Sequence, residues 1–225
     1  MKKEYFGTGV FLLTLLLTLF IAGCALGGLS SDSCQELKGS QKDNCYFEEH
    51  KCSKMSNAAF RDSCVVELAK GKNDLGVCSL IKSEATRGYC HEQIAVQRND
   101  HSLCRSIANT YWEDNCHFRL AINNSNGIYC SLIKDTLQNA ECHRVVAIAS
   151  NDTALCHFLD NRTMDQCVVK IASNLEDIET CNEVSSPLGI DACRLKIAKL
   201  RHDETLCKTI KNSAVRESCV QQLKT

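Results

Sequence analysis

The sequence predicts an all-α fold, an α-solenoid of about eight helical hairpins with a period of about 26 residues. Three observations predict it. A pattern of a capping residue, a cysteine and aliphatic residues, clearest over residues 74–99, returns as far as the C-terminus. Cysteines recur in evenly spaced pairs, and proline, which disfavours helix interiors, occurs only once. Hairpins of this kind stack on their neighbours, because one hairpin cannot bury its own apolar face.

The cysteines indicate one disulfide inside each repeat. The chain has 17 cysteines in 225 residues, a density typical of an oxidising compartment. Sixteen of them form pairs separated by 11 or 12 residues, whereas the separation between pairs is 14 in six cases and 7 in one. The nearly constant spacing lies within the pairs, so the covalent link is expected there. The predicted pairs are Cys34 with Cys45, Cys52 with Cys64, Cys78 with Cys90, Cys104 with Cys116, Cys130 with Cys142, Cys156 with Cys167, Cys181 with Cys193, and Cys207 with Cys219.

Helix-capping residues precede both expected helices of a hairpin, because their side-chain oxygens can accept the free amide hydrogens of a helix start. Four residues before the first cysteine stand Ser30, Asp74, Asp100, Asn126, Asp152, Asp177 and Asp203. Six or seven residues before the second cysteine stand Ser83, Thr110, Asp135, Asn161, Ser186 and Ser213. The single proline follows one of these caps, at a position that a first helical turn tolerates.

Apolar residues at fixed distances from the cysteines define the expected core. Three residues after the first cysteine stand Leu37, Met55, Ile81, Ile107, Ile133, Leu159, Val184 and Ile210. Four residues after the second cysteine stand Leu68, Ile94, Leu120, Val146, Ile171, Ile197 and Leu223, and in six repeats an alanine follows: Ala69, Ala95, Ala121, Ala147, Ala172 and Ala198. A bulky residue beside a small one suits close packing of neighbouring helices.

Each repeat is therefore expected to contain two helices of about ten residues, which are marginal in isolation. A disulfide closing a loop of this size adds on the order of 3 kcal/mol. The first repeat is expected to differ, because Cys45 and Cys52 are seven positions, or two helical turns, apart. Its second helix should run straight into the first helix of the next repeat. The polar Glu49, at a position that is apolar in other repeats, suits an end cap.

The N-terminus indicates export. Lys2 and Lys3 precede an uncharged run over residues 5–31, with an aliphatic and aromatic centre over residues 10–21. Ile21-Ala22-Gly23-Cys24 resembles the lipobox of prokaryotic lipoproteins, and that resemblance implies cleavage before Cys24 and its lipidation. The expected organisation is a signal peptide or membrane anchor over 1–23, a tether over 24–31 and the repeat domain over 32–225.

An uncleaved transmembrane helix is the alternative, because 27 uncharged residues exceed the roughly 20 that cross a bilayer. In both cases the positive charges keep the N-terminus inside, and the repeat domain faces outward, at the periplasm or the cell surface.

Several residues are of types that can bind a metal or carry a modification. His91, His117 and His143 follow the second cysteine of three consecutive repeats, but stacked helices about 8–10 Å apart are too far apart to share one zinc, so a semi-buried packing role is expected. An acidic residue stands two before the second cysteine in six repeats, at Asp43, Asp62, Asp114, Asp165, Asp191 and Glu217, and a solvated mixed-charge face is expected. Three possible N-glycosylation sequons start at Asn123, Asn151 and Asn161, of which Asn161 also suits a helix cap.

These observations predict a membrane-anchored, extracytoplasmic binding or structural scaffold with an unidentified protein or peptide partner. No catalytic motif, cofactor or metal site is expected, and the balance of 26 basic against 27 acidic residues argues against nucleic acid. The alternative is an extracytoplasmic metal-binding or thiol-redox protein, although no CxxC occurs. Sel1-like repeats share the use of disulfides to hold helix pairs, but their period is longer and their motif is absent, so the likeness stays an analogy.

Overall fold

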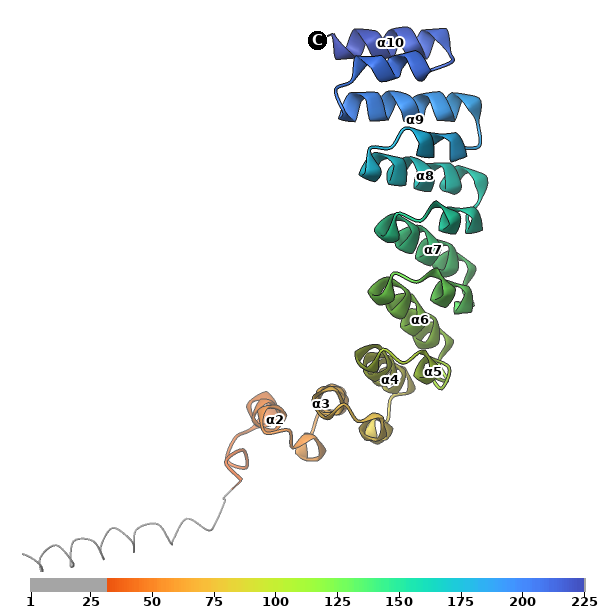
Figure 1. The fold of residues 1–225 in the computed structure, drawn as a ribbon. Coiled ribbons are helices and arrows are strands. Elements are labelled where there is room, and N and C mark those ends of the chain that lie inside the picture. Colours follow the sequence, from red (N-terminus) through yellow and green to blue (C-terminus); the bar gives the residue numbers. More distant parts are fainter. Residues whose placement is uncertain (1–31, 225) are drawn as a thin grey trace, which may run out of the picture. The chain divides into compact units, whose positions relative to one another are not determined.

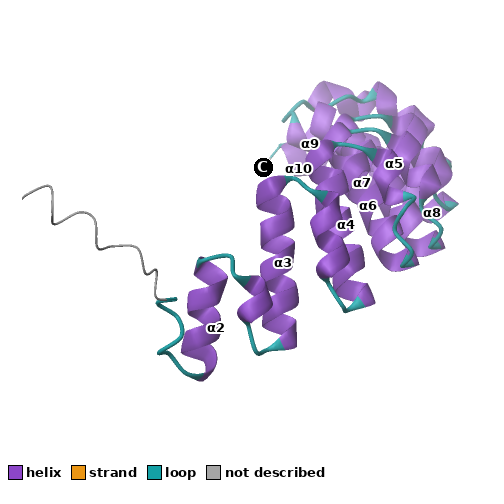
Figure 2. Ribbon diagram, turned by 90° about the horizontal axis from the view of Figure 1, so that it is seen from below, coloured by secondary structure: helices purple, strands orange, loops and turns teal. Residues whose placement is uncertain are grey.

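The computed structural model describes residues 32–224 of this chain (Figure 1). Regular structure in that range is helical throughout, with no strand (Figure 2). The described residues form two compact units, which divide between Cys64 and Val65. The α-helices are α2 (Gly39–Glu48), α3 (Ala58–Lys72), α4 (Glu84–Arg98), α5 (His101–Cys104), α6 (Thr110–Asn124), α7 (Thr136–Ser150), α8 (Asn161–Leu175), α9 (Pro187–Leu200) and α10 (Ser213–Leu223). The 3₁₀ helices are η1 (Cys52–Lys54), η2 (Leu75–Leu80), η3 (Gly127–Leu132), η4 (Thr153–Phe158), η5 (Glu179–Glu183) and η6 (Glu204–Thr209).

The disulfide-stapled helical repeat is confirmed, but the two elements of a repeat differ in length more than expected. Cys34 lies in a turn, and from Cys52 onward the first cysteine is carried by a 3₁₀ helix of three to six residues or by the four-residue α5. The second helix, in contrast, reaches 15 residues in the central repeats. The prediction of two helices of about ten residues is therefore wrong. In the described chain, every α-helix that carries a second cysteine begins six residues before it.

The short element is a 3₁₀ helix because its hydrogen bonds close over three residues from the start. The side chain of Asp74 accepts the amide hydrogen of Gly76 (2.9 Å), and the carbonyl of Asp74 accepts from Val77. The chain then becomes extended at Ile81 (φ −77°, ψ 127°), which places this side chain in the core at 1% exposure. Runs of 3₁₀ geometry longer than a turn or two are uncommon, so the element ends there.

The first set of predicted caps is confirmed where the structure describes it. Side chains accept amide hydrogens two residues on at Asp74, Asp100, Asn126, Asp152, Asp177 and Asp203; Ser30 lies outside the described residues. In the second set, Ser83, Asp135 and Ser186 are caps as predicted.

Three caps of the second set were predicted one residue too late. The capping side chains belong to Asn109, Asp160 and Asn212, not to Thr110, Asn161 and Ser213. In each case an asparagine or aspartate directly precedes the predicted residue, and these types cap at least as well as serine or threonine.

Most α-helices end on a left-handed residue, which the sequence analysis did not anticipate. The residues with φ of 48–55° are His50, Asn73, Asn99, Ser125, Asn151, Glu176 and His202. The residue that follows donates its amide hydrogen back to the helix, as Asp100 does to the carbonyl of Ala95 (2.9 Å). In six repeats the acceptor is the alanine five residues after the second cysteine. One short junction therefore ends a helix and starts the next turn.

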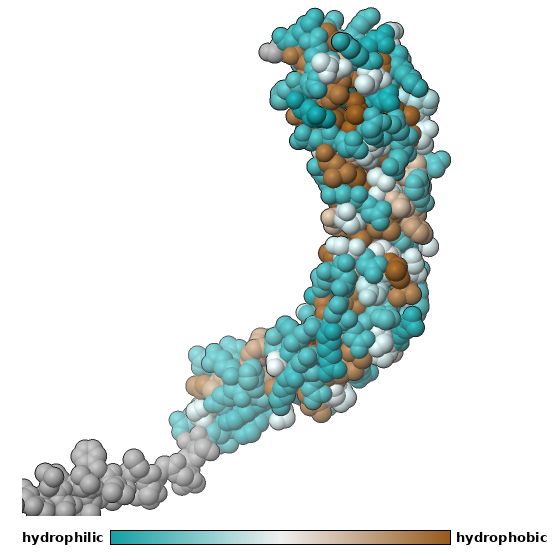
Figure 3. All heavy atoms as spheres, in the orientation of Figure 1, coloured by the Kyte–Doolittle hydropathy of each residue, from teal (hydrophilic) through white to brown (hydrophobic). Residues whose placement is uncertain are grey.

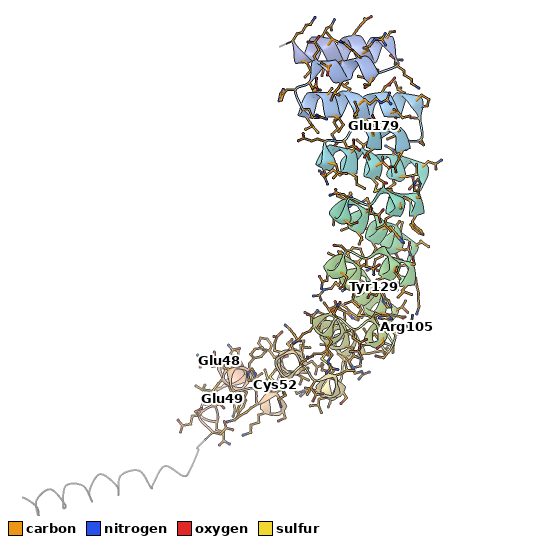
Figure 4. All side chains as sticks on the ribbon, viewed as in Figure 1. Glu48, Glu49, Cys52, Arg105, Tyr129 and Glu179 are labelled. Carbon is orange, nitrogen blue, oxygen red and sulfur yellow. A yellow bond between two sulfur atoms is a disulfide. The ribbon has the colours of Figure 1, made fainter. Side chains whose placement is uncertain are left out.

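The same junction overturns the continuous helix expected between the first two repeats. His50 is left-handed (φ 55°), and Lys51 donates its amide hydrogen to the carbonyl of Tyr46 (2.8 Å), so α2 stops and η1 starts separately at Cys52. Glu49, labelled in Figure 4, stabilises this turn at the end of α2. Its carboxylate accepts a hydrogen bond from Ser33 Oγ (2.8 Å) and forms an ion pair with Lys51 (2.6 Å).

In the second compact unit, successive long helices pack on one another in chain order from α4 to α10 (Figure 1). The predicted core is confirmed for the larger part. The six alanines are fully buried, together with Ile94, Leu120, Val146, Ile171 and Ile197. Leu68 and Leu223 are half-buried, near the two ends of this unit. Of the apolar residues after the first cysteine, seven are buried and Leu37 is 37% exposed.

Candidate functional site

The eight cysteine pairs expected from the spacing are the eight disulfides of the structure. Their Cα–Cα distances are 5.5–5.9 Å, within the usual range for a bridge. All these cysteines are buried except Cys45, which is half-buried. The sulfurs are thus part of the core of each repeat.

Metal-binding geometry occurs once among the described residues, where ligand atoms of Cys34, Cys45 and Glu49 lie within 4.8 Å of one another. Two of the three are bonded to each other as a disulfide, which removes the thiolates that a soft metal would need. Glu49 is also engaged by Ser33 and Lys51. The cluster is therefore a disulfide beside an ion pair.

The three histidines occupy packing positions on α4, α6 and α7. His117 and His143 are 1% exposed and His91 is half-buried. The His143 ring stacks on Phe158 (centroids 4.4 Å apart, planes 13° apart), and its Nδ1 lies 3.1 Å from the carbonyl oxygen of Asn139. Burial lowers the pKa of all three imidazoles below the usual range, which favours the neutral rings.

The acidic residues two before the second cysteine are structural, and the solvated face expected for them is wrong. Asp43, Asp62, Asp114 and Asp191 are 1–6% exposed and Asp165 is half-buried. Four of these carboxylates, at Asp43, Asp114, Asp165 and Asp191, accept amide hydrogens from the residues just before the next long helix. We call this contact the aspartate clamp.

The geometry of the clamp is clearest at Asp114. Its two carboxylate oxygens accept the amide hydrogens of Lys134 and Asp135, each at 2.9 Å, directly before α7. Asp191 does the same for Lys211 (2.9 Å) and Asn212 (2.7 Å) before α10. These amides stand in an extended segment between the short element and the helix, so a partner from the preceding repeat satisfies them.

These hydrogen bonds lower the pKa of the clamp carboxyls at Asp43 and Asp191. The amide hydrogen of Ser56 lowers the pKa of the Asp43 carboxyl, and the Asn57 amide and the Ser56 hydroxyl add to this effect. At Asp191 burial opposes ionisation, but the amides of Lys211 and Asn212 outweigh it, so the pKa lies below the ordinary value. Glu217, at the equivalent position on α10, is exposed.

Two repeats carry a small residue where the clamp would be, and an apolar side chain of the next helix packs there instead. A Cβ atom at Gly88 would lie 2.7 Å from Cδ1 of Trp112 and 3.3 Å from its Cβ. Trp112 also contacts Tyr89, with ring centroids 5.1 Å apart. Ala140 packs in one cluster with Met164 of the next long helix. Apolar contacts thus replace the clamp at Gly88 and Ala140, whereas Asp114, Asp165 and Asp191 keep it.

Glu92, on α4, is fully buried and forms a salt bridge with Arg119. Its Oε1 accepts from Arg119 (2.6 Å) and Asn115 (3.3 Å) on α6, and its Oε2 accepts from Gln93 (2.5 Å). Removing one partner from such a pair would leave an uncompensated buried charge. The contact therefore holds α4 and α6 in one register.

Shallow furrows run along the outward side of the long helices in the second compact unit. We call this side the helical face; it is formed by the residues one before and two, three, six and seven after the second cysteine. One furrow, of about 420 Å³, is lined by Lys70, Gly71, Gln93, Val96, Gln97 and Arg119. Another, of about 540 Å³, lies between α8 and α9, and a third, of about 460 Å³, follows α9. Figure 3 shows apolar patches among hydrophilic surface over these C-terminal helices.

Three sequence-based predictions concern surface modification and the membrane. Asn123, Asn151 and Asn161 are exposed, but glycosylation stays a prediction, and Asp160 takes the capping role considered for Asn161. The signal peptide, the tether and lipidation of Cys24 lie outside the described residues. Among the described helices, none combines the length and apolar character needed to span a bilayer.

The chain is an all-helical, disulfide-stapled repeat protein. Comparison with models of protein families, with curated proteins and with solved structures finds no match to this chain.

Proposed function

We propose that this chain is a membrane-anchored, extracytoplasmic scaffold that binds a protein or peptide partner on its helical face. The observation that carries the proposal is the presence of furrows at two places on the helical face, one lined by residues 70–119 and two adjoining ones along α8 and α9. Repeat proteins use such extended surfaces to bind elongated partners.

Covalent stapling supports a scaffold role. Each repeat is closed by its own disulfide, so the surface is held in one conformation before binding, and ordering on binding costs little. Eight buried bridges also indicate an oxidising compartment, in agreement with the export signal.

Anchoring is tested by Cys24→Ser in the full-length protein, with membrane fractionation and metabolic labelling with a radiolabelled fatty acid. A lipoprotein loses the label and is no longer processed before residue 24. Retention of an unlabelled, uncleaved wild-type chain in the membrane would instead show the single transmembrane anchor.

Binding is tested by photo-crosslinking in intact cells. A photoreactive amino acid replaces Gln97 or Gln166, exposed residues that line two furrows, or Ser79 in η2, an exposed control outside the furrows. The proposal predicts one discrete adduct from both furrow positions and none from Ser79. Equal adducts from the control position, or no adduct from either furrow position, would contradict it.

A further inference from the structure

The furrow between α8 and α9 combines an apolar floor with positive charge that makes no ion pair. Val169, Val184 and Ala192 contribute apolar surface to it. Lys170 and Lys196 line it and stand at the same position of consecutive repeats, three residues after the second cysteine. Both lysines are exposed, and neither makes a salt bridge with the described residues.

Two further observations concern the charge in and beside this furrow. Lys199, one helical turn after Lys196, lines the adjoining hollow and donates to the amide oxygen of Gln222 (2.8 Å). Asp165 is the one acidic residue that lines the α8–α9 furrow. Its carboxylate accepts hydrogen bonds from the backbone amide and the hydroxyl of Ser185, each at 2.7 Å. The furrow therefore presents net positive charge above an apolar floor.

We propose that this furrow binds an extended acidic segment of a partner protein, with apolar side chains between its carboxylates. The inference rests on the proposed binding function and names the chemistry of the partner. Carboxylates would pair with Lys170 and Lys196 while apolar side chains cover Val169 and Ala192.

Spacing favours an extended segment. Packed helices lie about 8–10 Å apart, which sets the separation of equivalent residues such as Lys170 and Lys196. A polyproline II segment rises about 3.1 Å per residue, so every third side chain recurs after about 9.3 Å on the same side. A carboxylate at every third position therefore matches the repeat.

The probe is a fluorescent peptide of four Glu-Pro-Leu triplets, titrated by anisotropy against the full-length protein in detergent micelles. Control peptides replace glutamate by lysine, or keep the composition and place the glutamates next to one another. The proposal predicts saturable binding of the triplet peptide, weaker binding of the clustered peptide, none of the lysine peptide, and a rising Kd with salt. Equal binding of all three peptides, or no binding of the triplet peptide, would overturn it.

Charge reversal locates the site. The double variant Lys170→Glu, Lys196→Glu should raise Kd at least tenfold, which corresponds to about 1.4 kcal/mol. The control is Lys82→Glu, Lys208→Glu, which makes the same change in net charge at exposed positions outside the furrow and should change Kd less than threefold. Equal effects of the two double variants would show attraction by net charge alone and refute the site.

A bulky substitution separates this inference from the proposed function. Ala192→Trp fills the floor of the furrow without changing charge. If Ala192→Trp abolishes the cellular adduct from position 166 and charge reversal does not, the helical face binds a partner but the acidic chemistry is wrong. Displacement of the peptide by a sulfated polysaccharide at lower concentration than by unlabelled peptide would also overturn a protein segment as the ligand.

Discussion

Replacing Asp114 by alanine tests the aspartate clamp. Asp114 is 1% exposed and accepts two amide hydrogens at 2.9 Å, from Lys134 and Asp135. A hydrogen bond to a charged group contributes about 1.5–3 kcal/mol, and an amide left without a partner adds a desolvation cost. Because both bonds are lost, we expect Asp114→Ala to lower the free energy of unfolding by at least about 3 kcal/mol.

The assay is urea unfolding with all disulfides intact, together with hydrogen exchange of the two amides. Exchange at positions 134 and 135 should accelerate in the Asp114 variant. The matched control is Glu217→Ala, at the equivalent position of the last repeat, where the side chain is exposed; a change within about 0.5 kcal/mol is expected. If both variants unfold like the wild type, or if the two amides keep their protection, the clamp does not stabilise the stack.

Three other predictions use single substitutions. Burial depresses the pKa of His143, so the unfolded chain, with an ordinary pKa of about 6.5, binds a proton that the folded chain does not. Stability should therefore fall as pH drops below about 6.5, and His143→Gln should lessen this fall in urea titrations at two pH values. Gly88→Ala should destabilise by about 1–2 kcal/mol because the tryptophan in contact must move, whereas Gly71→Ala, with open space around it, should stabilise by about 0.5–1 kcal/mol. Glu176→Gly should raise stability by about 1 kcal/mol in thermal unfolding, because φ is 51° there, and a decrease would show that the junction is not strained.

The fold could be predicted from the sequence because the residues that determine it lie close together in the chain. The spacing of Cys78 and Cys90 reports a contact within one repeat, and the alanine five residues after the second cysteine in six repeats reports a helix packed closely on its neighbour. The left-handed helix ends were missed, since Glu176 and His202 are not typical of that conformation. Their position directly before the next capping aspartate is the signal that could have identified them.

The clamp was not predictable from residue type alone. Asp114 lies between Glu113 and a polar Asn115 in the sequence, which is typical of a solvated helix surface, while its partners lie 20 and 21 residues away. Only the packing of one repeat on the next shows that the carboxylate is buried. The furrows on the helical face likewise depend on how successive helices align, and neither Lys170 nor Ala192 is exceptional in its own helix.

Within-repeat cross-linking is tested most directly by proteolytic mapping of the unreduced, thiol-blocked protein by mass spectrometry. The structure predicts eight linked peptides joining the cysteines of each repeat, with Cys78 bonded to Cys90, and no blocking reagent on any of the sixteen. Peptides that join Cys90 to Cys104, or alkylated cysteines beyond residue 33, would contradict it.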